Sequence, residues 1–239
     1  MKLQADILAE LRKDILLMQG FKPASNAANG GPLSLINAAF PNATFPLAAI
    51  HEFICQSPQE VSASYGFISG IASSLAKQNG IIVWVTPSPV FPHALKMFGV
   101  APEQVLFIHP SRQKDFLFVV EEVLKCDAID AVIADVKEIS FTESRRLQLS
   151  VEHSGVTGFL VRHKPKNFAT CSVTRWRIQP IIHDQVTELP GICFPAWNIE
   201  LLKVRNGKPG RWKMEWQRSG FKLIQPELPV IETQLRKVV

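Results

Sequence analysis

The chain has 239 residues, of which 46% are hydrophobic and 20% charged, so it can bury a sizeable core and its composition is not that of a disordered protein. Its formal charge of +5 is unevenly placed: residues 1–154 carry 12 Lys and Arg against 15 Asp and Glu, net −3, and residues 155–239 carry 14 against 6, net +8. No apolar run approaches the roughly 20 residues that a bilayer-spanning helix needs, and charged residues interrupt the N-terminus, so we expect neither a membrane partner nor a signal peptide.

The N-terminal segment is predicted to be an amphipathic helix over residues 2–19. Its apolar residues recur at helical spacing: Leu3, Ile7, Leu8, Leu11, Ile15 and Met18. The residues up to Pro32 are rich in Gly, Asn, Ala and Pro, which is typical of a linker. We therefore expect residues 1–32 to form a helix and linker, and the helix can either fold back on its own domain or dock on a partner. Its docking residues would be Leu3, Ile7, Leu11 and Ile15.

Residues 48–77 have the layout of a phosphate-binding loop. A short apolar strand, 50–55, is followed by a predicted loop, 56–62, and then by a helix rich in small residues. A working loop of this kind reads G-x-x-x-x-G-K-[ST], because glycines let backbone N–H groups approach the phosphates and the Lys reaches the outer ones. The layout predicts a nucleotide-binding ancestry.

The loop lacks the residues of that motif. Cys55 and Glu60 take the two Gly positions, Val61 takes the Lys position, and only Ser62 fits. A carboxylate and an aliphatic chain would lie where the phosphate binds. Charge repulsion and the cost of desolvation would therefore both oppose nucleotide binding. The sequence predicts a degenerate P-loop without a nucleotide cofactor; the alternative is an ordinary strand-to-helix turn that never held phosphate.

Strands and helices alternate from residue 47, which is typical of a parallel sheet with crossover helices. The predicted strands are 81–85, 105–108, 131–134 and 156–161, and the predicted helices are 90–98, 113–125 and 142–153, the last capped by Thr142 or Ser140. Only strands follow residue 168: 171–178, 198–204, 211–216 and 221–224, with a hairpin turn at 206–210. The predicted fold class is α/β, a mostly parallel sheet with flanking helices and a C-terminal antiparallel extension. We expect this core to span 33–224 and residues 225–239 to form a flexible tail.

Asp135 ends an apolar strand, where open α/β sheets bind ligands and where P-loop ATPases hold Mg²⁺. A lone Asp without the loop Lys is a weak metal site, and we expect a capping or relic role. The stretch 86–89, at the end of the strand that follows the P-loop helix, has no carboxylate to orient water. The four cysteines and six histidines show no metal-ligand spacing, so buried thiols in a reducing cytosol are expected. The sequence thus predicts no enzyme, no metal and no cofactor.

Basic residues gather late in the chain and interleave with Trp176, Trp197, Trp212 and Trp216. Cations beside aromatic rings suit single-stranded DNA, whose phosphates meet the cations and whose bases stack on the rings. The candidate DNA-binding residues are Arg162, His163, Lys164, Lys166, Arg175, Arg177, Lys208 and Arg211. The alternative places the indoles in the core and the cations in water on the opposite strand face, and the alternation of Arg175, Trp176 and Arg177 is what it predicts.

Several stretches resemble the bacterial ImuA family. They are F-P-L at 45–47 before I-H-E at 50–52, the strand 131–135, S-R-R-L-Q-L at 144–149 leading to S-G-V-T-G at 154–158, T-R-W-R at 174–177 and K-P-G-R-W-K-M-E-W at 208–216. The likeness covers about residues 33–218. The family looks like a shortened RecA core that has generally lost a working Walker A motif, and this sequence resembles RecA itself more distantly.

The resemblance implies a non-enzymatic accessory role in damage-induced mutagenesis, within the SOS response. ImuA-family proteins are associated in translesion synthesis with ImuB, a Y-family polymerase-like protein, and with an error-prone replicative-type polymerase subunit; RecA is a further candidate partner. The implied location is the cytoplasm, with the nucleoid when DNA is damaged. A relation to RecA would make 162–166 a DNA-facing loop and the N-terminal helix a protomer-docking element. The alternatives are a SulA-like cell-division inhibitor that acts by protein binding and an ATPase with an aberrant P-loop.

Overall fold

The computed structural model describes residues 33–76, 80–112, 115–181, 194–217 and 220–224, together with Leu11. Leu11 is helical and 51% exposed. The rest of the predicted N-terminal helix and linker, including Leu3, Ile7 and Ile15, lies outside the described residues, as does the predicted tail.

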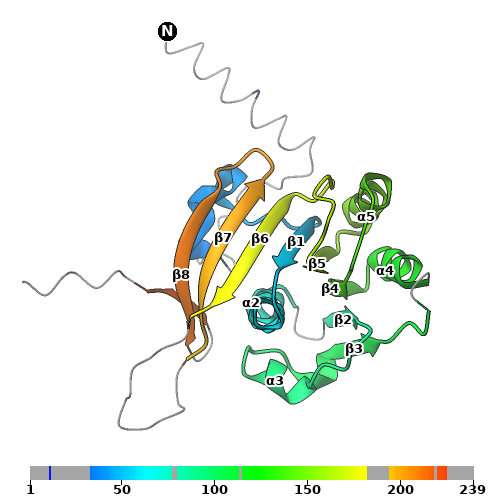
Figure 1. Ribbon diagram of the computed structural model, residues 1–239, viewed down its shortest axis with the longest axis horizontal. Coiled ribbons are helices and arrows are strands. Elements are labelled where there is room, and N and C mark those ends of the chain that lie inside the picture. Colours follow the sequence, from blue (N-terminus) through cyan, green and yellow to red (C-terminus); the bar gives the residue numbers. More distant parts are fainter. Residues whose placement is uncertain are drawn as a thin grey trace, which may run out of the picture.

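Nine strands form one sheet in the order β3-β2-β4-β5-β1-β6-β7-β8-β9 (Figure 1). The first six in this order run parallel: β3 (Val105–Ile108), β2 (Ile81–Val85), β4 (Ile129–Asp135), β5 (Thr157–His163), β1 (Ile50–Cys55) and β6 (Thr174–Pro180). The last three add antiparallel pairs: β7 (Ala196–Val204), β8 (Gly210–Gln217) and β9 (Gly220–Leu223). The predicted α/β class with an antiparallel extension is confirmed.

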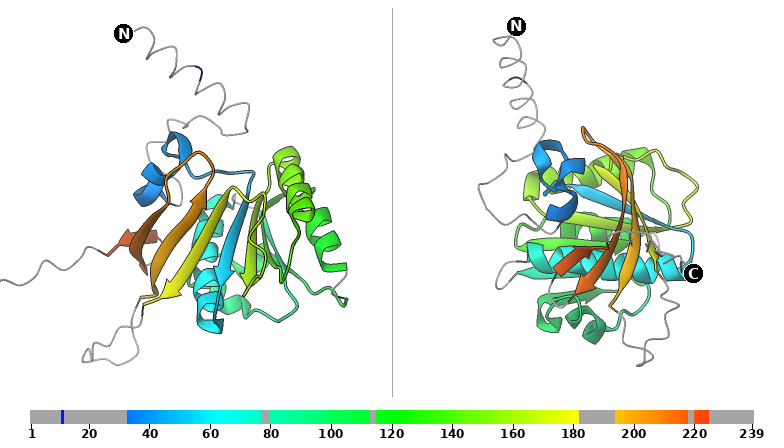
Figure 2. Two further views of the ribbon diagram at one scale, coloured as in Figure 1. Left: turned by 45° about the horizontal axis from the view of Figure 1, so that its top comes forward. Right: turned by 90° about the vertical axis from the view of Figure 1, so that its left-hand side faces the viewer.

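Helices cover the two faces of the sheet unequally (Figures 1 and 2). One face carries α2 (Pro58–Leu75), which packs on β1, β4, β5 and β6, and α3 (Pro92–Lys96) contributes to the same core. The opposite face carries α4 (Phe116–Leu124) and α5 (Phe141–Ser154), whose main strand contacts are β4, β2 and β1. Short 3₁₀ helices, which the sequence did not indicate, are η1 (Ser34–Ala39), η2 (Pro41–Ala43) and η3 (Pro102–Gln104). Among the described helices, none is long and apolar enough to cross a bilayer.

Alternation along β1 assigns its side chains to the two faces. Phe53 and Cys55 belong to the core beneath α2, whereas Ile50 belongs to the core beneath α4 and α5. Because side chains two apart in a strand share a face, Glu52 points to the α5 side. The chain therefore places one carboxylate inside an otherwise apolar layer.

Glycines of α2 allow aromatic rings to approach the helix closely. A Cβ at Gly70 would lie 2.7 Å from the Trp216 ring and 2.8 Å from that of Phe221, and one at Gly66 would lie 2.8 Å from the Phe98 ring. Contacts this short do not occur between real side chains, so larger residues would displace the rings. The small-residue pattern of this helix thus reflects packing of the antiparallel strands and α3 against it.

Ser140, one of the two candidate caps, begins α5. Its Oγ accepts the backbone N–H of Glu143 at 3.2 Å, and the Glu143 carboxylate accepts the N–H of Ser140 at 2.8 Å. This reciprocal pair is a capping box, which satisfies two N–H groups at the helix start. The alternative prediction, Thr142 as the cap, was wrong, because Thr142 lies inside the first helical turn.

Candidate functional site

The turn between β1 and α2 is shorter than predicted. β1 ends at Cys55 and α2 begins at Pro58, so only Gln56 and Ser57 connect them instead of a loop over 56–62. Ser57 is extended and its Oγ accepts a backbone N–H of the first helical turn, while Pro58 stands where its missing N–H is no loss. These two local signals start the helix early and leave a two-residue turn.

Glu60 closes this turn with its carboxylate. Its Oε2 accepts the backbone N–H of Gln56 at 2.7 Å, and its Oε1 accepts Nη2 of Arg177 at 2.8 Å and Nε2 of Gln179 at 3.3 Å. Burial by itself would raise the pKa of Glu60, but the hydrogen bonds from Arg177 and Gln56 outweigh it and hold that pKa below its usual value. An ionised side chain of the protein thus occupies the anion-binding groups of the turn.

The other residues of the predicted degenerate site are spread around the start of α2. Cys55 is buried with its Sγ 3.4 Å from the Ser64 hydroxyl, and burial raises the pKa of this thiol to about 11. Val61 packs against the core, and the Ser62 hydroxyl donates to the Pro58 carbonyl at 3.3 Å. Both belong to the helix, so they do not form a loop around a ligand.

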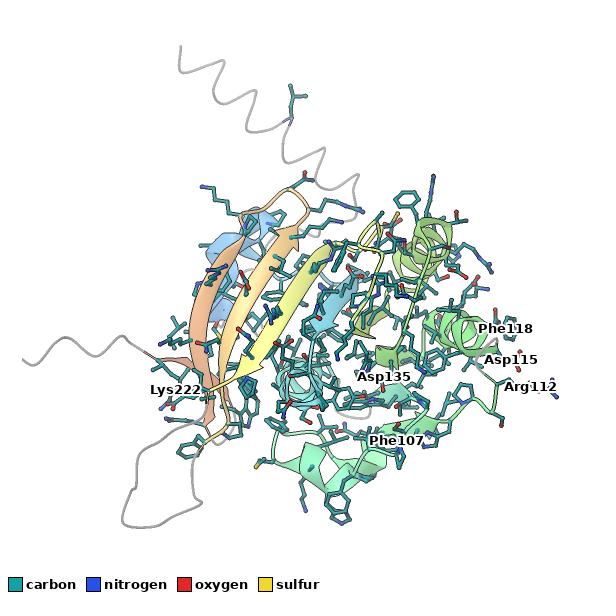
Figure 3. The ribbon with its side chains drawn as sticks, viewed as in Figure 1. Phe107, Arg112, Asp115, Phe118, Asp135 and Lys222 are labelled. Carbon is teal, nitrogen blue, oxygen red and sulfur yellow. The ribbon has the colours of Figure 1, made fainter. Side chains whose placement is uncertain are left out.

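Asp135 lies at the carboxyl end of β4, near α2 (Figure 3). Its Oδ2 accepts the Tyr65 hydroxyl at 2.5 Å and the Thr86 hydroxyl at 2.6 Å, and its Oδ1 lies 3.7 Å from Nε2 of His163. Burial, and then the neighbouring charge of Asp135, raise the pKa of Tyr65, so the phenol stays a donor. Asp135 therefore joins α2 to β2. Within the described ranges, no group of three or more His, Cys, Asp or Glu could hold a metal ion.

A buried charge network centres on Glu52, on the α5 side of β1. Glu52 is 1% exposed and Arg162 is completely buried. Nη1 of Arg162 lies 2.5 Å from Oε1 of Glu52, Nε of Arg175 lies 2.7 Å from its Oε2, and Nη2 of Arg162 reaches Glu138 at 3.4 Å. Glu52 and Glu138 together compensate the charges of the two guanidinium groups.

The same network fastens the connection between β5 and β6, residues 164–173, which crosses this face without a helix. The hydroxyls of Thr170 and Ser172 donate to Oε2 of Glu52 at 3.1 and 3.2 Å. From β7 and its hairpin, Lys203 donates to the Thr170 carbonyl at 3.1 Å and Arg205 to the Cys171 carbonyl at 3.0 Å. Side chains thus satisfy backbone groups that a crossover helix would satisfy by itself.

The stretch 162–166, for which a relation to RecA would imply a DNA-facing loop, begins inside a strand. β5 extends to His163, so Arg162 lies in a strand, and its guanidinium is buried rather than presented to solvent. Arg175 also serves the Glu52 network, and Arg177 serves Glu60. All three cations are paired with carboxylates of the protein; Arg162 and Arg175 are buried or nearly so, whereas 35% of the Arg177 side chain is exposed.

The remaining candidates are exposed but do not share one surface. Lys164 and Lys166 follow the carboxyl end of β5, with His163 half exposed beside them. Lys208 lies in the β7–β8 hairpin. This hairpin is at the opposite end of the parallel strands, because the end of β7 pairs with the start of β6. Arg211 is in β8, with 81% of its side chain exposed.

The indoles lie in the core, as the alternative interpretation predicted. Trp176, Trp197 and Trp216 are buried, and Trp212 packs partly buried against the same cluster. They face α2, whereas Arg177 faces the other side of the sheet. The rings of Trp176, Trp197 and Trp216 are therefore not available as stacking platforms for bases.

His51, in β1, is a buried neutral histidine. The Pro46 carbonyl, 2.9 Å from Nε2, can only accept, so Nε2 carries the proton. Nδ1 then accepts the Thr174 hydroxyl at 2.7 Å, and that hydroxyl accepts the Trp176 indole N–H at 2.7 Å. Burial is the main cause that lowers the pKa of His51 to about 3.

This pKa predicts an acid-sensitive fold. Above pH 6.5 His51 is neutral whether folded or unfolded, but below it only the unfolded chain binds the proton, so stability falls as the pH drops from 6.5 towards 3. Between pH 7 and pH 5 the loss is about 2 kcal/mol. We expect His51→Gln to reduce this pH-dependent loss by that amount in urea unfolding, whereas His153→Gln, on the exposed face of α5, leaves it unchanged. An unaltered pH dependence in the His51 variant would contradict the assignment.

The sequence does contain one signal for the charge network around Glu52. Glu52 stands inside an apolar strand, and a carboxylate in a buried strand requires a partner. The partners Arg162 and Arg175 come from distant strands, and Tyr65 and Thr86 carry no local signal for their bonds to Asp135.

The fold and the residues at the carboxyl ends of its parallel strands define an α/β protein whose mostly parallel sheet continues into antiparallel strands. No family model matches the chain. The chain is similar to Protein ImuA of Caulobacter vibrioides, in strain NA1000 / CB15N and in strain ATCC 19089 / CIP 103742 / CB 15, each 25% identical over 199 residues that cover 77% of this chain and 82% of the relative. This similarity supports membership of the ImuA family, in agreement with the resemblance found in the sequence.

Proposed function

We propose that this protein is a non-enzymatic accessory factor of damage-induced, error-prone translesion DNA synthesis. It acts as an adaptor that docks on an ImuB-like polymerase homologue and an error-prone replicative-type polymerase subunit, with RecA as a further candidate partner. The observation that carries the proposal is the similarity to Protein ImuA over 199 residues. The proposed location is the cytoplasm, with association with the nucleoid when DNA is damaged.

The β1–α2 turn supports the non-enzymatic part of the proposal. An incoming phosphate would meet the ionised Glu60 and find the Gln56 N–H and the Arg177 guanidinium already bonded to it. The phosphate and the ionised Glu60 carboxylate carry like charges and would repel each other. Displacing Glu60 from Gln56 and Arg177 would leave a buried carboxylate without partners. Asp135 is likewise already engaged, because its Oδ2 accepts the hydroxyls of Tyr65 and Thr86.

Within this proposal, contact with DNA is made by exposed cations that lie beside the carboxyl ends of the parallel strands. Lys164 and Lys166 are exposed, and the half-exposed ring of Phe168 follows them in the same connection. Binding through them would be electrostatic and would weaken as salt rises. Lys164→Ala with Lys166→Ala is therefore the informative pair for single-stranded DNA, rather than any variant of Arg162.

A complementation experiment tests the proposed function. Deleting the gene from its bacterial host is expected to abolish most ultraviolet-induced mutations, and the wild-type gene and Ser62→Ala are both expected to restore them. Ser62 is the one residue that fits the phosphate-loop motif, and its exposed hydroxyl donates to the Pro58 carbonyl within the helix. Failure of Ser62→Ala to restore mutagenesis, together with ATP binding that this change abolishes, would favour the ATPase.

Affinity capture with the tagged protein from damaged cells separates the two non-enzymatic functions. Capture of a polymerase-like protein is the expected result. Capture of a tubulin-like cell-division protein instead, with normal mutagenesis in the deletion strain, would favour the SulA-like alternative.

A further inference from the structure

The antiparallel half of the sheet has one face in the core and one face without a covering helix. On the inner side, Trp176, Ile199 and Met214 belong to the core beneath α2. The helices on the other side, α4 and α5, pack mainly on β4, β2 and β1, and Figure 1 shows them over that half of the sheet. At the end near Lys203 and Arg205 this outer face meets the connection 164–173, and beyond that end the outer face of β6, β7 and β8 is open within the described part of the chain.

Strand register places polar residues in two rows across this outer face. The first row joins Arg177, Glu200 and Arg211. The second row joins Gln179, Asn198 and Lys213. All six line a shallow depression of about 540 Å³.

The charge of this face is positive. The rows carry three cations and one carboxylate; Arg177 is paired with Glu60, which leaves Arg211 and Lys213 against Glu200, and the next row pairs Glu215 with Lys222, which Figure 3 labels at the edge of the sheet. Glu200 bonds Arg211 at 2.7 Å, yet the Arg211 side chain is 81% exposed, and such an exposed pair exchanges partners at little cost. Lys213 is exposed and forms no ion pair with any described residue. Arg211 and Lys213 are thus accessible to an external anion.

The chemistry of the face distinguishes between two kinds of acidic ligand. Single-stranded nucleic acid binds best where aromatic rings stack on its bases, but Trp176, Trp197 and Trp216 of these strands are buried in the core, and the partly buried Trp212 is the one aromatic residue among those that line the depression. The side-chain amides of Gln179 and Asn198 lie in one row with Lys213, beside the row that holds Arg211. The Asn198 amide can bond both the N–H and the C=O of a peptide, and the oxygen of Gln179, whose Nε2 donates to Glu60 at 3.3 Å, can accept a peptide N–H. Amides next to accessible cations match an extended chain with acidic side chains.

We propose that the outer face of β6, β7 and β8 binds an acidic, extended polypeptide segment of a partner protein. The identity of the partner as a member of a DNA repair assembly rests on the proposed function, whereas the ligand chemistry rests on the face itself. Arg211 and Lys213 make the charged contacts, and Gln179 and Asn198 make the peptide contacts.

Fluorescence anisotropy with the full chain tests the proposal. The probes are a short labelled peptide of alternating Glu and Ser and an oligothymidylate of the same length. We expect the peptide to bind at low salt and Arg211→Glu with Lys213→Glu to weaken it by about tenfold or more. The matched control, Lys96→Glu with Arg145→Glu, changes the same total charge at exposed positions on α3 and α5 and is expected to leave the affinity within about twofold.

Three outcomes would overturn the proposal. Equal weakening by the control pair would mean that only total charge matters. Tighter binding of oligothymidylate, released by the same Arg211 and Lys213 changes, would assign the face to nucleic acid. Binding of neither probe would leave the face without an acidic ligand, even where affinity capture of the polymerase-like partner succeeds. Lys213→Glu alone, with a melting temperature equal to wild type, guards against misfolding of the double variant.

Discussion

Replacing Glu52 with Gln is expected to lower the free energy of unfolding by about 3–5 kcal/mol, because it leaves a buried guanidinium without its carboxylate. Arg162 is completely buried and lies 2.5 Å from Glu52, so no water can take over the role of the lost charge. The second guanidinium, that of Arg175, loses the same partner. Urea unfolding followed by tryptophan fluorescence measures the loss directly.

A matched variant on the same network separates burial from simple ion pairing. Glu138 also contacts Arg162, but 52% of its side chain is exposed, so Glu138→Gln is expected to cost less than about 1 kcal/mol. Equal losses in the two variants would mean that burial of Glu52 is not what makes its charge important. Glu52→Leu combined with Arg162→Met is expected to recover part of the loss, because a buried pair can be replaced by apolar contacts.

The Glu52 network has a mechanical consequence for the connection at 164–173. This segment holds the exposed Lys164 and Lys166, and its fixed points are Thr170 and Ser172 on Glu52 and the Lys166 N–H on Glu138. Removing Glu52 therefore releases a surface segment as well as destabilising the core. Buried charge here positions the exposed charge.

Local patterns were sufficient for most of the elements. The apolar runs at 81–85 and 105–108 match β2 and β3 as predicted, because continuous apolar residues bounded by turn residues leave little alternative in a buried parallel strand. The hairpin at 206–210 followed from its Asn-Gly turn. Both cases depend on interactions within a few residues.

The candidate site depended on partners far apart in the chain, which no local pattern encodes. Glu52 and Arg162 are 110 residues apart, and Glu60 and Arg177 are 117 apart. Aligning 55–62 to a phosphate-loop motif also concealed a plain helix start at Ser57 and Pro58. Sequence patterns identified the basic residues, but only the fold shows which of them are already paired.

Replacing Trp176 with Ala is expected to lower the free energy of unfolding by about 3–5 kcal/mol, as for other large core residues. The indole is completely buried, with ring centroids 6.0 Å from Phe40, 6.1 Å from Phe67 and 6.2 Å from Phe53. Its N–H also holds the Thr174 hydroxyl that donates to His51, so the change disturbs both packing and a buried polar chain. Urea unfolding followed by circular dichroism measures it, since fluorescence would lose a reporter.

Trp176→Phe provides the control, because it keeps a ring in the core and removes only part of the indole and its N–H. We expect a loss of about half that of the Ala variant or less. Neither variant is expected to change the affinity of the folded protein for oligothymidylate, since the ring faces α2 rather than solvent. A Trp176→Ala protein of normal stability that binds oligothymidylate more weakly would instead identify the indole as an exposed stacking platform, and the assignment of the sheet faces, including the open one, would then be wrong.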